Sequence, residues 1–137
     1  MRTTAVITGV AAAVAIVSTL AAGPAAADPM QQAPDALVLT VSNANAATSP
    51  GSERAVTLSC TPDPAGDHPD PAAACDSLLG VHGDIAALAA GGSVCPEIYV
   101  PVTATAVGVW NGQSFSYQQT FTNECFLLRA TGAVFAF

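Results

Sequence analysis

The chain contains 137 residues, which suits one domain and is too short for two of ordinary size. Its composition is acidic, with ten Asp plus Glu against three Lys plus Arg and a formal net charge of −7. Because an acidic surface repels phosphate groups, we exclude nucleic acid and anionic membranes as partners.

The first 27 residues have the pattern of a secretory signal peptide. Arg2 supplies positive charge, an apolar run extends from residue 5 to 20, and a glycine-proline break precedes the small residues 25–27. An uncleaved membrane anchor is the weaker alternative, because the run has a helix-breaking exit and no positive flank behind it. We therefore expect a secreted, extracellular protein with a mature domain over residues 28–137.

The first half of the mature chain predicts two strands. Residues 36–41 form a β-branched and apolar run between polar, turn-forming neighbours. Residues 54–60 alternate apolar and polar side chains, as expected of a half-buried strand antiparallel to the first. The segment 61–71 contains four prolines, which exclude regular structure there.

Two short helical segments are predicted next. Asp70-Pro71 is a favourable helix start, because Asp accepts from free amides of the first turn and Pro needs no amide partner there. The resulting helix spans residues 71–79 and ends at Gly80. A second helical piece is predicted over residues 84–90.

The strongest local signal is Asn111-Gly112, which lies between two β-prone runs, 102–110 and 113–122. Both residues tolerate positive φ, as a type I′ hairpin turn requires. The apolar residues 133–137 predict a closing strand. The predicted fold is therefore α+β, with a five-stranded antiparallel sheet and two short helices on one face.

Four cysteines lie in the mature part, and this even number predicts two disulfides in a small exported protein. Three pairings are formally possible. We favour Cys60 with Cys75 and Cys95 with Cys125, because each bond then closes a modest local loop. A zinc site is disfavoured, since the chain has no Cys-x-x-Cys pair.

Motifs of enzymes are missing from the sequence, which has no nucleophile, metal or phosphate-binding signature around its two histidines. The nearest approach to a metal site is the set Asp63, Asp67, His68 and Asp70, but proline-rich loops usually carry charge because they are solvated. We therefore expect neither an enzyme nor a bound metal or cofactor.

The segment 94–101 is unusually stiff, because a disulfide cysteine stands near one end and prolines fix the backbone at Pro96 and Pro101. A serine protease binds rigid, extended backbone as an added strand in its cleft, and preorganisation lowers the entropy cost of binding. Stiffness alone does not separate two interpretations of this segment, an inhibitory loop and an ordinary disulfide-bonded loop between two elements.

The mature chain resembles the Streptomyces subtilisin inhibitor family from residue 36 to residue 137. The residues that carry the resemblance are 36–41, 53–58, His68-Pro69, Cys95-Pro96, 108–112, Asn123-Glu124-Cys125 and 134–137. The resemblance implies a five-stranded antiparallel sheet with two helices, the sequential disulfides, and a sheet-mediated homodimer with one reactive loop per subunit.

The resemblance also implies a scissile bond, Glu97–Ile98, at the position where a serine protease attacks family members. Its flanking and supporting residues are Cys95, Pro96, Tyr99, Val100, Pro101 and Asn123. Asn123 matches an asparagine whose side-chain amide supports the loop backbone. The resemblance thus predicts a substrate-like inhibitor of extracellular serine proteases.

Glu97 departs from the residues usual at this position, which are Met, Lys or others suited to subtilisin-, chymotrypsin- or trypsin-like pockets. An unpaired carboxylate is costly in an apolar pocket, so a glutamate-specific serine protease (glutamyl endopeptidase) is the expected partner beside subtilisin-like enzymes. Val100 departs from the acidic residue common in its place. The alternative hypothesis is a secreted binding or structural domain that has kept this fold without inhibition.

Overall fold

The computed structural model describes residues 34–43, 53–89, 91–92 and 94–137. The predicted signal peptide, residues 1–27, lies outside this range, so its boundary stays a prediction. Within the described ranges, no helix is both long and apolar enough to cross a membrane.

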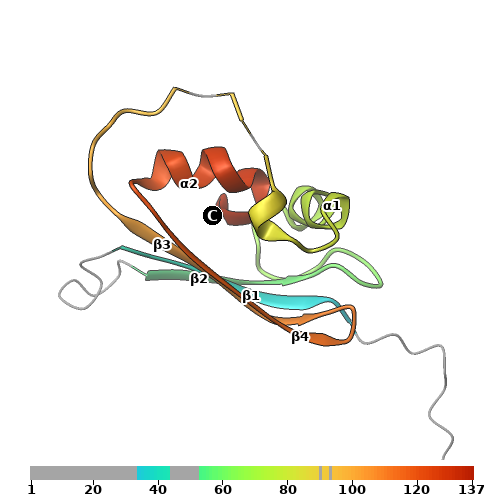
Figure 1. Cartoon of the computed structure of the whole chain (residues 1–137). Helices are drawn as coiled ribbons and strands as arrows, with labels where there is room; N and C mark the ends of the chain where they lie inside the picture. Colours follow the sequence, from blue (N-terminus) through green and yellow to red (C-terminus); the bar gives the residue numbers. More distant parts are fainter. Residues whose placement is uncertain (1–33, 44–52, 90, 93) are drawn as a thin grey trace, which may run out of the picture.

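Four antiparallel strands form one sheet in the order β2-β1-β3-β4 (Figure 1). They are β1 (Ala36–Asn43), β2 (Glu53–Ser59), β3 (Val102–Trp110) and β4 (Gln113–Phe121). The four strands predicted over these parts of the chain are confirmed, as is the antiparallel pairing of the first two. The two central strands, β1 and β3, carry most of the buried side chains of the sheet.

The turn between β3 and β4 has the predicted conformation, with φ of 51° at Asn111 and 73° at Gly112. Asp35, the residue before β1, supports the turn, because its carboxylate accepts from the backbone N–H of Asn111 at 2.6 Å. The hairpin is thereby tied to the start of β1.

Two α-helices, α1 (Pro71–Gly80) and α2 (Glu124–Thr131), cover one face of the sheet (Figure 1). The 3-10 helices η1 (Ile85–Ala87) and η2 (Gly132–Phe135) lie with them. The predicted start of α1 is confirmed, since the Asp70 carboxylate accepts from the backbone N–H of Ala73 at 3.1 Å. The second predicted helical piece, 84–90, is reduced to the single turn of η1.

The predicted closing strand over residues 133–137 is wrong, and the sheet has four strands rather than five in the described residues. This segment forms η2 instead, with Val134 and Phe135 buried in the core between helices and sheet. A short apolar run is compatible with a strand or with a buried helical turn, and periodicity alone does not separate them.

Helix α2 was not predicted, although the sequence contains its capping signals. The Asn123 side chain accepts from the Phe126 N–H at the start, Arg129 lies in the last turn, and Gly132 follows at φ 56°. The helix therefore begins directly after the residues that end β4, and it carries Cys125 in its first turn.

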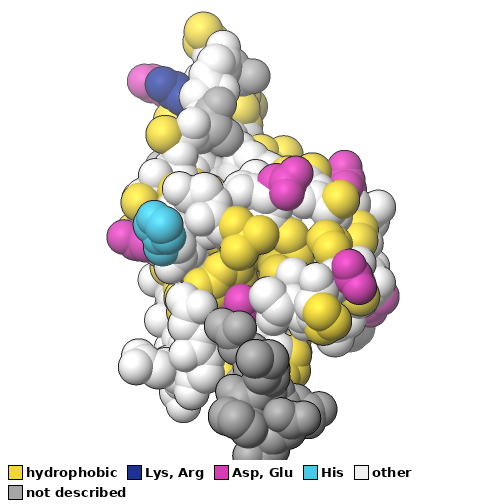
Figure 2. Space-filling view, turned by 90° about the vertical axis from the view of Figure 1, so that its right-hand side faces the viewer, with side chains coloured by type: hydrophobic (Ala, Val, Ile, Leu, Met, Phe, Trp, Pro, Cys, Tyr) yellow, Lys and Arg dark blue, Asp and Glu magenta, His cyan; other side chains and the backbone are white. Residues whose placement is uncertain are grey.

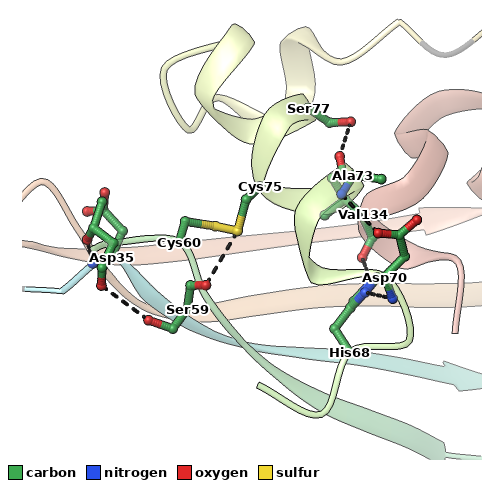
Figure 3. The surroundings of a disulfide bond; sticks show 10 residues. Asp35, Ser59, Cys60, His68, Asp70, Ala73, Cys75, Ser77 and Val134 are labelled. Atoms are coloured by element: carbon green, nitrogen blue, oxygen red, sulfur yellow. Dashed lines mark hydrogen bonds between the residues drawn. A yellow bond between two sulfur atoms is a disulfide. The ribbon is translucent and has the colours of Figure 1, made fainter. Parts of the chain in front are cut away.

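The proline-rich segment connects β2 to α1 and is hydrogen-bonded to β2. Figure 3 shows the disulfide next to it and the residues around that bond. The disulfide Cys60–Cys75 joins the end of β2 to α1. The buried His68 ring accepts from the Asp70 N–H through Nδ1 at 3.0 Å, so the hydrogen lies on Nε2, 3.2 Å from the Val134 carbonyl oxygen. Both ring nitrogens of His68 are therefore hydrogen-bonded to backbone groups.

Candidate functional site

The segment 94–101 leaves the body of the protein after η1 and returns at β3 as an arch beyond α2 (Figure 1). It contains neither helix nor strand, and most of its apolar side chains are exposed to solvent. The exposed fraction is 97% for Val94, 61% for Ile98 and 77% for Tyr99. Neighbouring apolar side chains that stand in water mark an interaction surface.

A disulfide holds the first half of the arch. Cys95 is bonded to Cys125 in the first turn of α2, with 5.7 Å between their Cα atoms. Cys95 is buried, whereas its neighbours Val94 and Pro96 are exposed. The favoured pairing of all four cysteines is confirmed, and the second bond fixes the arch to a helix.

Asn123 holds the centre of the arch through its side-chain amide. Its Nδ2 donates to the carbonyl oxygens of Pro96 at 2.9 Å and Ile98 at 2.8 Å. Its Oδ1 accepts from the Phe126 N–H at 3.2 Å, which caps α2. The two loop carbonyls lie on either side of residue 97, so this single amide fixes the backbone before and after the Glu97–Ile98 peptide.

The second half of the arch joins the sheet. The Val100 N–H donates to the Thr122 carbonyl oxygen at 3.0 Å, and the half-buried Pro101 leads into β3. Thr122 directly follows β4, so this bond ties the end of the arch to the short segment between β4 and α2. The arch is thus supported at Thr122, Asn123 and Cys125, three positions within four residues.

A hollow of about 340 Å³ remains beneath the arch. It is lined by Asn43, Pro96, Ile98, Val100, Val102, Asn123, Glu124 and Cys125. The loop therefore rests on a few point contacts rather than on continuous packing. Its backbone is fixed while its outer surface stays open to a partner.

Charged side chains of both signs lie in and beside the arch. Glu97 is exposed at its centre, and Glu124 lies in the first turn of α2. Arg54 of β2 donates to Glu124 through Nη2 at 2.7 Å, the single ion pair found in the described part of the chain. On the face shown in Figure 2, acidic side chains are scattered around an apolar area.

The residues predicted for the site divide into two groups. Glu97, Ile98, Tyr99 and Val100 are exposed on the arch, whereas the supporting residues contact the body of the protein. Sequence reasoning missed the support at Thr122 and the ion pair of Glu124 beside the arch. The capping pattern of α2, which places Asn123, Glu124 and Cys125 together at the helix start, was the available signal for Glu124, whereas Thr122 had none.

The chain was compared with known proteins and solved structures. A family model described as subtilisin inhibitor-like matches residues 33–123. Subtilisin inhibitor-like protein 4 of Streptomyces lavendulae is 50% identical over 115 residues, covering 83% of this chain and 99% of that protein. The subtilase-type protease inhibitor of Streptomyces coelicolor is 48% identical over 117 residues, covering 85% and 81%.

Among solved structures, Streptomyces caespitosus sermetstatin in complex with Bacillus licheniformis subtilisin matches with a TM-score of 0.61 at 37% identity. The match covers 76% of this chain and 99% of that chain. The chain therefore belongs to the subtilisin inhibitor-like family, whose members named here are protease inhibitors and not enzymes.

Proposed function

We propose that this protease inhibitor acts as a trapped substrate of a serine protease, to which it presents the bond Glu97–Ile98. The observation that carries the proposal is the double hydrogen bond of Asn123 to the carbonyl oxygens of Pro96 and Ile98. It fixes the backbone on both sides of one exposed peptide bond, and the disulfide at Cys95 adds a covalent restraint.

The proposed mechanism follows the ordinary acyl transfer of the protease. The protease serine attacks the Glu97 carbonyl carbon, the bond from that carbon to the Ile98 nitrogen breaks, and the nitrogen takes up a proton. Asn123 keeps both new ends beside each other, because it holds the residues that flank them. The Ile98 amine therefore attacks the ester again faster than water does, and the complex persists.

The Glu97 side chain sets the proposed specificity. It is exposed at the centre of the arch and would enter the primary pocket of the protease. An unpaired carboxylate buried in an apolar pocket costs several kcal/mol, and about 1.4 kcal/mol is a factor of ten in affinity. A serine protease whose pocket solvates glutamate is thus the favoured target, and subtilisin-like enzymes bind through the remaining backbone contacts.

Titration of subtilisin, trypsin and a glutamyl endopeptidase with the purified protein tests the proposal. We expect stoichiometric loss of activity, tightest for the glutamyl enzyme. Glu97→Gln keeps the shape of the side chain and removes its charge, so it should weaken glutamyl endopeptidase binding selectively. Glu97→Lys should move inhibition toward trypsin. Specificity that ignores both substitutions would contradict Glu97–Ile98 as the reactive bond.

The export of the protein is a separate part of the proposal. We propose that residues 1–27 are removed on secretion, as the composition of this segment favours. Intact-mass measurement of the protein recovered from culture medium should give a chain that begins at Asp28. Recovery of the full chain in the membrane fraction would contradict this assignment.

The exposed face of the sheet is the proposed homodimer interface. Val38 of β1 lies opposite Val107 of β3, and both side chains are 43% exposed, with Val109 next to them at 36%. Sedimentation should give a dimer, and Val107→Glu should shift it toward the monomer because it places a charge in the buried patch. A wild-type monomer at micromolar concentration would contradict the dimer.

A further inference from the structure

The geometry of the arch depends on one turn of helix. Thr122 accepts from the loop backbone, Asn123 donates to it twice, and Cys125 is bonded to it covalently. Any shift of this turn relative to the sheet would move all of these supports together. The contacts that fix the turn therefore also fix the loop.

Buried side chains hold the later part of α2 more firmly than its start. Its buried residues are Leu127, at the end of the first turn, and Thr131, the last residue of the helix. Cys125 is only half-buried and Glu124 is exposed. In the first turn Phe126 packs against the core, and Glu124 adds a polar link to the sheet by accepting from Arg54 at 2.7 Å.

The ion pair reaches across the sheet. Helix α2 is reached from β4, one edge of the sheet, whereas Arg54 lies on β2, the opposite edge, seventy residues earlier. The starts of β2 and α2 lie on the same side of the molecule, below the arch (Figure 1). Arg54 therefore ties the first turn of α2 to the strand most distant from its covalent attachment.

We infer that Arg54 is a positioning residue of the reactive loop, acting through Glu124 on Asn123. The inference rests on the proposed function, because it assigns Arg54 a part in holding the Glu97–Ile98 bond. The side chains of Arg54 and Glu124 are 46% and 51% exposed, so we expect their ion pair to have a modest effect on inhibition. Exposed ion pairs are worth about 0.2–1 kcal/mol, which corresponds to roughly 1.4- to 5-fold in an inhibition constant.

The first experiment compares inhibition constants and cleavage rates. Arg54→Gln and Glu124→Gln should each weaken inhibition up to about fivefold and speed cleavage of the Glu97–Ile98 bond. The double variant should be no weaker than either single variant, because both remove the same contact. Arg54→Lys keeps a positively charged donor, so its inhibition constant should stay close to the wild-type value.

Arg129→Gln is the matched control. Arg129 lies in the last turn of the same helix with an exposed side chain, so its removal changes net charge equally without touching the ion pair. If Arg54→Gln and Arg129→Gln have equal effects, Arg54 acts only through net charge and the inference is overturned. Additive effects of Arg54→Gln and Glu124→Gln would overturn it as well.

A readout without protease separates this inference from the proposed function. Hydrogen exchange of the Asn123 side-chain amide and the Phe126 backbone N–H, followed by NMR, reports whether the cap and the loop contacts persist. We expect faster exchange of both in Arg54→Gln than in Arg129→Gln. If the wild type inhibits no protease, the proposed function fails, while this exchange still decides whether Arg54 positions Asn123; unchanged exchange would refute it.

Discussion

Two proline-containing segments of this protein are held by disulfides, yet only one of them stands away from the body of the protein. The segment 61–70 lies flat on β2, where Ser59 and Ala65 exchange backbone hydrogen bonds at 2.8 Å in both directions. A Cβ at Gly66 would collide with the Thr57 carbonyl oxygen, which shows how closely the two backbones approach. The segment 94–101 instead stands above a hollow on separate supports.

The contrast shows that stiffness alone does not create a binding loop. The first segment covers the outer edge of β2, which would otherwise expose unpaired backbone groups. The second leaves its backbone open and fixes it from below. Exposure combined with restraint therefore distinguishes the segment that carries the proposed reactive bond, Glu97–Ile98.

Removing each disulfide separates the two roles with the largest expected effect. The chain-entropy model gives a loss of about 3 kcal/mol for the 15-residue loop of Cys60–Cys75 and about 3.6 kcal/mol for the 30-residue loop of Cys95–Cys125. We expect Cys95→Ser with Cys125→Ser to become a substrate that is cleaved at Glu97–Ile98. Mass spectrometry after incubation with protease measures this cleavage.

The matched control is Cys60→Ser with Cys75→Ser, which loses stability by a similar amount and leaves the arch tied to α2. At a temperature where both variants are folded, the control should inhibit as the wild type does. Equal loss of inhibition in the two variants would mean that the bonds act only through global stability, and the contrast between the segments would fail.

Asn123→Asp tests the hydrogen bonds of the arch with the second largest effect. Aspartate retains the oxygen that caps α2, so helix stability is kept. It loses both N–H donors and places a charge beside the carbonyl oxygens of Pro96 and Ile98. Two lost hydrogen bonds of about 1 kcal/mol each predict roughly 30-fold weaker inhibition, measured as the inhibition constant.

The cap of α1 provides the comparison. Asp70→Ala removes the side chain that accepts from the Ala73 N–H and should cost about 1 kcal/mol in thermal unfolding. Its inhibition constant should stay at the wild-type value, because α1 does not support the arch. An Asn123→Asp variant that inhibits as well as Asp70→Ala does would show that the loop carbonyls need no donor.

The parts of the fold that were predicted from the sequence have local signals. Asp70-Pro71 indicates the start of α1, and Asn111-Gly112 indicates the hairpin, because each requires particular residues at particular φ angles. The segment 133–137 has no such signal. Its apolar side chains fit either a strand or a buried turn, and only its packing under α1 and α2 decides between them.

The candidate site could be predicted from the sequence to a similar extent as the fold. The stiffness of 94–101 follows from Cys95, Pro96 and Pro101, and the resemblance supplied the positions of the proposed reactive bond. The pairing of Glu124 with Arg54 could not be predicted, because it joins residues seventy positions apart and depends on how α2 crosses the end of the sheet.

The smallest predicted effect is the loss of stability in acid that comes from the segment 61–70, which is packed on β2. Thr57 donates to the Asp67 carboxylate through its hydroxyl at 2.6 Å and also through its backbone N–H, and these bonds lower the pKa of Asp67 below its ordinary value of 3.8. A lowered folded-state pKa contributes stability that is present above the unfolded pKa and is lost as pH falls through the folded value. The free energy of unfolding, measured with urea, should therefore decrease below about pH 4.

Asp67→Asn should remove this part of the pH dependence, whereas Asp63→Asn, in the same segment, should keep it. Because Asp67 lies far along the chain from the arch and binds β2, neither substitution should change the inhibition constant at neutral pH. An acid response of Asp67→Asn identical to that of the wild type would show that the bonds to Thr57 do not hold the packed segment.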